Sequence, residues 1–191
     1  MPPKFKFTKD EIIDAALNII RKNGASALTA RALAEELGCS VKPIFGLFKN
    51  MEQVQQEVFA AAQSLYQSYL QKDMLSGKYP QYKSSGMAYI RFAREEKELF
   101  KLLFMRDRSG ENIEENREEV KPFIELIKQS IGLGEEKAYL FHIEMWIFVH
   151  GIATMIASSY LEWSDSLVSE SLTDMYTGLK YCYSERQQEE N

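Results

Sequence analysis

The residues best suited to chemistry are few and far apart in this chain of 191 residues. The two histidines, His142 and His150, are separated by about 12 Å if they lie on one helix. To share one zinc ion, a nitrogen of each ring would have to lie about 2 Å from the metal. The two cysteines, Cys39 and Cys182, form neither a disulfide framework nor a metal-ligand cluster. The sequence therefore predicts no metal site, and its cysteine usage fits a reducing cytoplasm.

The sequence also contains no motif typical of catalysis. No nucleophile elbow, phosphate-binding loop or pair of catalytic carboxylates stands out. The composition, with 45% hydrophobic and 27% charged residues, is that of an ordinary soluble globular protein. We therefore expect a binding protein and not an enzyme, and we expect no cofactor.

Three short helices are expected in the first 50 residues, because three residues suited to cap a helix occur there. Thr8 is followed three residues later by Glu11, which is the capping-box pattern. Thr29 precedes a second apolar-periodic segment, which ends at Gly38. Ser40 is expected to cap the third segment.

The second and third segments are joined in "LAEELGCSVKPIFGLF" (33–48). Gly38 suits a tight turn, and Pro43 falls in the first turn of the next helix, where its missing N–H costs no intrahelical hydrogen bond. Ile44 and Phe48 are expected to pack this helix on the first one. Two short helices joined in this way form a helix-turn-helix, whose second helix fits the major groove of DNA.

The remainder of the chain also reads as helical, without strand alternation. Pro122 is expected near the start of a helix, and "RDRSGENIEEN" (106–116) is expected to be a loop. The expected helices after residue 50 are 51–75, 82–95, 97–106, one that ends by 132–134, 135–160 and 165–185. The predicted fold is all-α with about nine helices, divided into a helix-turn-helix domain over 1–50 and a helical domain over 51–191.

Charge is distributed unevenly along the chain. Residues 1–50 hold eight Lys or Arg and five Asp or Glu, a net charge of +3, and the remaining residues hold 15 and 23, a net charge of −8. A basic segment attached to an acidic one is a weak indication that the basic segment meets a polyanion. Lys4 and Lys6 are compatible with an arm along DNA and with a solvated tail.

Residues 8–54 resemble the DNA-binding head of the tetracycline-repressor (TetR) family of transcriptional regulators. The matching pieces are "T..EII.AAL.II...G", "LTARALAEELG" and "CSVKPIFGLFKNMEQV", which follow one another without a gap. A fainter likeness is "WIFVHG" (146–151), which is similar to the Trp-His-Gly signature of one group of the family's C-terminal domains. The resemblance implies a cytoplasmic repressor that binds a palindromic operator in double-stranded DNA as a homodimer.

The resemblance also implies which residues contact the DNA. These eight residues are Thr29, Arg31, Ser40, Val41, Lys42, Pro43, Phe45 and Lys49. Thr29 and Lys49 would meet phosphates, Arg31 would reach a base edge or a phosphate, and the segment 40–43 would face the major groove.

The third segment departs from the family pattern in its polarity. Phe45 lacks the hydroxyl of the usual phosphate-binding Tyr, Leu47 replaces a usually polar residue, and Met51 replaces a usual Lys. Lys42 is the only charged residue of the recognition helix, which favours contacts to thymine methyl groups and to DNA shape over bidentate base contacts. Phe45 itself is equally compatible with the core and with the groove.

The last two helices are suited to form the dimer. The segment 139–161 carries one charged residue, Glu144, and so has little solvent face. Gly151 and Ala153 would permit a close approach of helices, although a central core helix would have the same features. The most apolar part, Met145–Ala157, is too short to span a bilayer, so no membrane contact is expected.

Aromatic residues of the larger domain exceed what close packing requires, and the family resemblance suggests a cavity there for a lipophilic small molecule. The tentative ligand-binding residues are Tyr66, Phe92, Phe100, Phe104, Trp146 and His150. Each is also compatible with plain core. Ligand would displace the long helix 51–75 and change the separation of the two heads. The alternative is a helix-turn-helix regulator whose body docks a protein partner and binds no small ligand.

Overall fold

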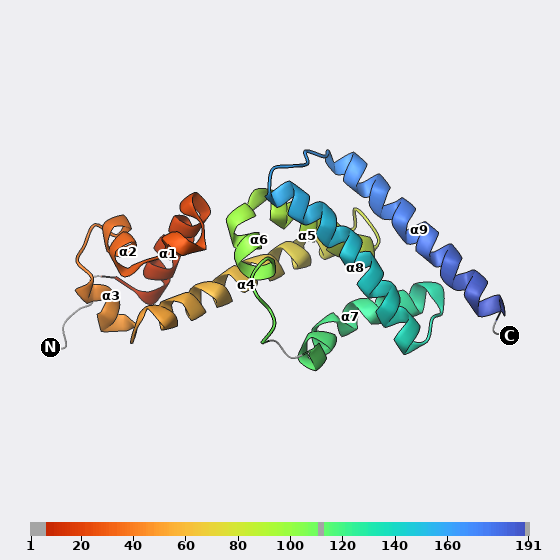
Figure 1. Cartoon of the computed structure of the whole chain (residues 1–191), viewed down its shortest axis with the longest axis horizontal. Helices are drawn as coiled ribbons and strands as arrows, with labels where there is room; N and C mark the ends of the chain where they lie inside the picture. The colour runs from red at the N-terminus through yellow and green to blue at the C-terminus, as the bar shows by residue number, and fades with distance from the viewer. Residues whose placement is uncertain (1–6, 111–112, 190–191) are drawn as a thin grey trace. The chain divides into compact units, whose positions relative to one another are not determined.

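The computed structural model describes residues 7–110 and 113–189 of the chain (Figure 1). All the regular elements within these residues are helical. They are α1 (Lys9–Asn23), the 3-10 turn η1 (Ala25–Ala27), α2 (Ala30–Glu36), α3 (Lys42–Leu47), α4 (Met51–Leu75), α5 (Gln81–Glu95), α6 (Lys97–Phe104), α7 (Ile113–Ile131), α8 (Glu135–Ala157) and α9 (Asp165–Glu189). The predicted all-α class with about nine helices is confirmed.

The chain divides into two compact units. Unit 1 comprises Met1–Ser68 and Glu95–Arg106, and unit 2 comprises Tyr69–Arg94 and Asp107–Asn191. α4 contributes residues to both units, α6 belongs to unit 1, and α7, α8 and α9 belong to unit 2. The predicted boundary at residue 50 divides the chain by expected function, which is a different criterion from compactness. This boundary stays a prediction.

α1 begins at the predicted capping box. Thr8 Oγ1 accepts a hydrogen bond from the Glu11 N–H at 3.2 Å, and Glu11 Oε2 accepts one from the Thr8 N–H at 2.7 Å. The inward face of the helix is almost completely buried at Ile12, Ala16 and Ile20. These residues repeat every four positions and form the apolar stripe with which α1 enters the core of unit 1.

The turn after α2 is a Schellman motif, which closes the end of a helix with two backbone hydrogen bonds. The Cys39 N–H donates to the Ala34 carbonyl at 2.9 Å, and the Gly38 N–H donates to the Glu35 carbonyl at 3.0 Å. Gly38 has a φ of +59°, a conformation that strains any residue with a side chain. The predicted role of Gly38 in this turn is therefore confirmed.

The predicted N-cap of α3 is wrong by one residue. The helix begins at Lys42 after Val41 as the N-cap, and no side chain caps it. A cap at Ser40 would use the backbone N–H of residue 42 or 43, and Pro43 has none, so one of the two donors is missing. Pro43 does lie in the first turn of α3, as predicted.

α6 packs on α1 within unit 1, an arrangement that the sequence did not predict. Leu99, Phe100 and Leu103 of α6 are buried. At the start of α6, Arg21 donates from Nε and Nη2 to the two carboxylate oxygens of Glu96, at 2.7 and 2.9 Å. This two-pronged ion pair adds orientation to the apolar packing. α6 therefore belongs to the same compact unit as the helix-turn-helix.

The core of unit 2 is built by its C-terminal helices. The buried cluster consists of Ile124, Ile127, Leu133, Ala138, Phe141, Met145 and Tyr183. α7 begins at Ile113, inside the predicted loop, and Pro122 lies in its interior and not near its start. The loop prediction is correct for 106–110 and wrong for 113–116, because the Glu and Arg residues before Pro122 are also good helix formers. The missing N–H of the proline removes a single hydrogen bond of the helix.

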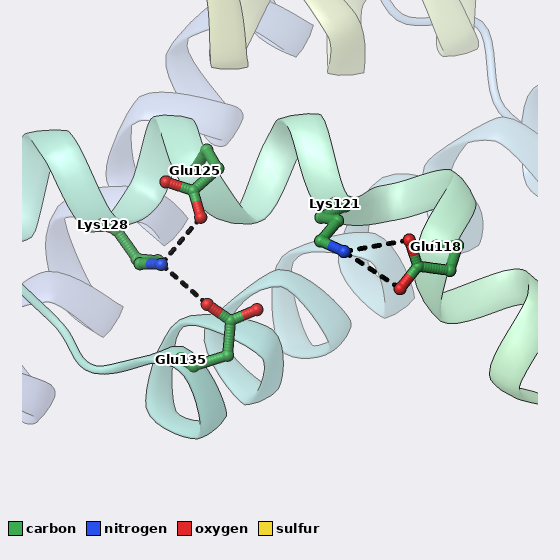
Figure 2. Close-up of polar contacts among 5 residues, drawn as sticks. All are labelled: Glu118, Lys121, Glu125, Lys128 and Glu135. Carbon is green, nitrogen blue, oxygen red and sulfur yellow. Dashed lines mark hydrogen bonds and ion pairs between the residues drawn. The ribbon is translucent and has the colours of Figure 1, made fainter.

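Charged side chains connect α7 to the start of α8, as Figure 2 shows. Lys128 Nζ donates to Glu125 Oε1 and to Glu135 Oε2, both at 2.7 Å. Hydrogen bonds to the two acids raise the pKa of Lys128, and the bond from Lys128 lowers the pKa of Glu135. Because these groups lie in solvent, the ion pairs orient the α7–α8 corner and add little stability.

α8 is longer than its most apolar part. It has 23 residues, and by length and composition alone it is sufficient to cross a membrane. The expectation concerned the 13 residues Met145–Ala157 alone, and the whole helix is longer. The central helix of a soluble protein has the same properties, and α8 buries one face that includes Phe141, Val149 and Ile156.

His142 of α8 is buried beside two aromatic side chains. Its Nδ1 lies 3.1 Å from Tyr82 Oη, and its ring stacks on Phe123 with centroids 5.6 Å apart. Burial lowers the pKa of His142 to about 4. The fold therefore accommodates the neutral imidazole.

We predict that acidification from pH 6.5 to pH 4 destabilises the protein through His142. The unfolded chain takes up this proton near pH 6.5, and the folded chain only near pH 4, so the unfolded state binds more protons in this window. The free energy of unfolding should fall by about 3 kcal/mol across it. Urea unfolding at pH 7 and pH 4 measures the loss. His142→Gln should lose less stability than wild type on acidification, and equal losses would refute the assignment.

Candidate functional site

α3 buries one face and exposes the other. Ile44 and Phe48 are 0% and 1% exposed, as predicted for core residues, whereas Val41 and Phe45 are 39% and 43% exposed. Lys42 is also exposed. The sequence left open whether Phe45 lies in the core or on the surface, and the structure places it on the surface.

The remaining candidates from α2 and the turn are accessible to a ligand. Thr29 Oγ1 accepts the Ala32 N–H at 3.1 Å, which confirms the predicted cap and leaves the hydroxyl hydrogen able to donate. Ser40 is exposed and does not cap α3, and Pro43 is half-buried. Lys4 and Lys6, the possible arm, lie outside the described residues.

The basic side chains of residues 7–68 in unit 1 fall into two groups. Three are neutralised by acids: Lys9 by Glu57, Arg21 by Glu96 and Lys22 by Glu36. Arg31, Lys42 and Lys49 are exposed and form no ion pair with any residue that the structure describes. Positive charge that is free to attract a polyanion is therefore concentrated on Arg31, Lys42 and Lys49.

The start of α4 fixes the backbone at Lys49. Asn50 Oδ1 accepts the Gln53 N–H at 2.9 Å, and Gln53 Oε1 accepts the Lys49 N–H at 2.8 Å. The Asn-x-x-Gln signal for this reciprocal cap is present in "NMEQ", although the cap was not predicted from it. The cap holds Lys49 at the junction of α3 and α4.

The six candidate ligand-binding residues are divided between the two units. In unit 1, the ring of Phe104 contacts Tyr66 at 5.1 Å and Phe100 at 5.2 Å between centroids. Phe100 is completely buried. This group therefore has the geometry of core packing.

The other three candidates belong to unit 2. Trp146 stacks on His150 at 4.9 Å, and His150 Nδ1 lies 2.8 Å from Tyr89 Oη. Burial and the nearby positive charge of Arg108 lower the pKa of His150. Phe92 is completely buried. Trp146 and His150 are half-buried, so they combine accessible surface with hydrogen-bonding groups. Tyr89, which orients His150, was missed from sequence.

A small cleft in unit 2 contains none of the six candidates. Its volume is about 120 Å³, and its lining includes Asp73, Arg91 and Asp165. Arg91 Nη2 donates to Asp73 Oδ1 at 2.7 Å, so these two charges already neutralise each other. Ligand pockets usually have roughly 300–1,000 Å³. The cleft is therefore too small for a drug-sized molecule.

The metal-ligating residue types remain dispersed in the fold. Across residues 7–110 and 113–189, no group of three or more His, Cys, Asp or Glu side chains is arranged to hold a metal ion. Both cysteines are free thiols, with Cys39 half-buried and Cys182 exposed.

α8 presents an apolar stripe on its outer face. Leu140, Ile147 and Met155 are 49%, 60% and 46% exposed. Gly151 lies on the same stripe, and a Cβ added there would meet no atom within 4 Å. The same holds at Gly178 in α9. Packing within the described chain therefore gives no reason for a glycine at either position.

Two protein-family descriptions match the chain. Residues 12–58 match "Bacterial regulatory proteins, tetR family". Residues 83–179, slightly more than half of the chain, match "Tetracyclin repressor-like, C-terminal domain". The second match contains the "WIFVHG" segment of α8. A comparison with curated proteins found no match.

Solved structures of bacterial regulators share the fold. A putative transcriptional regulator from Pseudomonas aeruginosa PAO1 has a TM-score of 0.70 at 14% identity, covering 93% of this chain and 92% of that one. A TetR-like regulator from Rhodococcus sp. RHA1 has 0.67 at 13%, covering 95% and 97%. The fatty acid degradation regulator FadR from Bacillus halodurans has 0.58 at 18%, covering 93% and 97%. At these identities the likeness concerns the fold alone.

The sequence matches agree with the geometry of the two units. The first match includes α2, the Schellman turn and α3, which together form the helix-turn-helix. The second includes most of the C-terminal helices. Regulators of this family are DNA-binding proteins and not enzymes, in agreement with the sequence prediction. The chain therefore belongs to the TetR family of bacterial transcriptional regulators.

Proposed function

We propose that this regulator is a homodimeric repressor that binds a palindromic operator and is released from it by a small molecule. The observation that carries the DNA contact is the position of the unneutralised cations. Lys42 begins α3, Lys49 follows its end and Arg31 is exposed on α2, whereas Lys9, Arg21 and Lys22 are held in ion pairs. A duplex offers a row of phosphates to such a group of charges.

The eight proposed DNA-contacting residues divide by their chemistry. Thr29 and Lys49 would bind phosphates, through a hydroxyl donor and an ammonium group, and Arg31 would bind a phosphate or a base edge. The segment 40–43 and Phe45 would enter the major groove with the exposed face of α3. We place this activity in the cytoplasm, where a bacterial regulator meets the chromosome.

We propose that the second copy of the chain covers the outer faces of α8 and α9. Glycine inside a helix costs about 0.5–1 kcal/mol relative to alanine. Gly151 and Gly178 occupy such positions without an internal contact that requires them. A closely approaching helix of a partner would supply the reason, and it would also cover Ile147 and Met155, two of the exposed apolar residues of α8.

The proposed effector is lipophilic and contacts Trp146 and His150. FadR of Bacillus halodurans, a fatty acid degradation regulator, has the same fold, so fatty acids are a first class of probe by analogy. α4 is unbroken from Met51 to Leu75 and contributes to both units. A displacement of its C-terminal end would reach Lys49 and change the spacing of the heads away from about 34–36 Å. Phe92 would pack near the ligand within unit 2, whereas Tyr66, Phe100 and Phe104 would be core packing of unit 1.

The second candidate function is a regulator whose C-terminal domain (51–191), and not a small ligand site, binds a protein partner. Two observations favour it: Phe92 and Phe100 are completely buried, and the cleft in unit 2 has only about 120 Å³. If the C-terminal domain binds no small ligand, its outer surface is the place where a signal could act. The same DNA contacts would serve both candidates.

We predict that Lys49→Ala weakens DNA binding on every sequence and flattens its salt dependence. The logarithmic slope of affinity against salt should fall by about 0.9 for each phosphate that the variant no longer neutralises. Lys42→Ala should instead reduce the preference for the selected operator over random DNA. Fluorescence anisotropy on both duplexes at several salt concentrations measures these effects.

Lys22→Ala is the matched control for these variants. It removes the same charge from the same unit, but Lys22 is paired with Glu36 at 3.1 Å. It should leave the salt slope almost unchanged. The site assignment fails if Lys22→Ala and Lys49→Ala have the same effect, or if neither lysine of the proposed interface alters binding.

We predict that Ile147→Glu converts the dimer into a monomer. Ile147 is 60% exposed in the single chain, so the charge should disturb the dimer interface and not the fold. Sedimentation velocity gives the oligomeric state, and circular dichroism verifies the helix content. Leu75→Glu is the control, because Leu75 is 75% exposed and lies outside the stripe. A dimer that survives Ile147→Glu would exclude this face.

We predict that an effector changes the fluorescence of Trp146 and lowers operator affinity together. The chain has two tryptophans, so Trp163→Phe leaves Trp146 as the single reporter. Medium-chain fatty acids are suitable probes, titrated with and without operator DNA. Binding that quenches Trp146 without weakening operator binding would contradict the induction mechanism. If no probe binds, the protein-docking candidate is favoured.

A further inference from the structure

The recognition helix exposes two large apolar side chains on one face. Val41 and Phe45, named here the apolar pair, are 39% and 43% exposed. They lie one helical turn apart, and the Phe45 N–H donates to the Val41 carbonyl at 3.3 Å. Ile44 of the helix and the C-cap residue Phe48 lie inside the core, and Leu47 is half-buried. The apolar pair is therefore not needed to hold α3 in place.

The outer face of α3 has few groups that can read bases by hydrogen bonds. α3 consists of "KPIFGL", in which Lys42 has the only polar side chain. Asn, Gln and Arg, the residues that pair bidentately with adenine or guanine, do not occur in it. In the major groove, the apolar group that bases present is the C5 methyl of thymine.

The charges around the apolar pair identify what covers it. Arg31, Lys42 and Lys49 are exposed and without ion pairs among the described residues. An apolar protein surface would leave these cations without partners, whereas the major groove offers thymine methyl groups between two rows of phosphates.

We infer that Val41 and Phe45 specify the operator by contacting thymine methyl groups in each half-site. This inference rests on the proposed DNA binding and adds the base that α3 selects. Burial of one methyl group against an apolar side chain should change affinity about fourfold. The cations supply affinity on any sequence, and the apolar pair supplies the preference for thymine.

Replacement of thymine by deoxyuridine tests the inference, because it removes the methyl group and keeps the base pair. The operator is first selected from randomised duplexes with the full-length protein. Each thymine of a half-site is then replaced in turn, and affinity is measured by anisotropy at constant salt. We expect about a fourfold loss at each contacted thymine and no loss at thymines in the flanks.

Variants of the apolar pair show whether these side chains read the methyl groups. Phe45→Ala and Val41→Ala should each abolish the deoxyuridine effect at one thymine position. Both side chains are exposed, so the helix content should be retained in circular dichroism. In Lys49→Ala, the matched control, binding should weaken while the deoxyuridine effect of about fourfold persists.

Several results would overturn the inference. One is that replacing each half-site thymine by deoxyuridine leaves the affinity unchanged. Another is that the selected half-sites contain no thymine. Self-association of the DNA-free chain that Phe45→Ala abolishes, with no change in DNA binding, would assign the apolar pair to a protein contact. If the wild-type chain selects no DNA at all, the proposed function itself fails; selection without a methyl effect removes this inference alone.

Discussion

The burial of Ile44 and Phe48 is the constraint on which the DNA-facing surface depends. α3 has six residues, and isolated helices shorter than about 12–15 residues are marginal in water. Tertiary packing must therefore hold it. Ile44 and Phe48 are almost completely buried, and Lys9 of α1 lies over the Phe48 ring at 5.2 Å. Beside these two buried residues, Val41 and Phe45 stay 39% and 43% exposed.

Packing orients α3, and ion pairs then determine which positive charges near it remain available to bind DNA. The net charge of the whole chain is −5, so the protein as a whole repels a polyanion. Within unit 1, Arg21 is bound by Glu96, and Lys22 is bound by Glu36. The attraction to DNA that we propose is therefore local. It comes from the few cations around α3 and is directed by the orientation of that helix.

The sequence predicted the local features well and the tertiary features poorly. The capping box at Thr8 and the turn at Gly38 follow from short-range chemistry, so they could be found. The wrong cap at Ser40 has a local cause too, the missing N–H of Pro43. The packing of α6 on α1 and the division of the aromatic candidates between two units depend on residues distant in sequence. Periodicity along the chain carries no information about such long-range packing.

The central claim is that two copies of this helix-turn-helix bind one duplex. Selection of DNA from a genomic library by the full-length protein tests it most directly. We predict an inverted repeat whose half-site centres are separated by about one helical turn or a multiple of it. Recovery of no enriched sequence, or of a single half-site without symmetry, would contradict this claim.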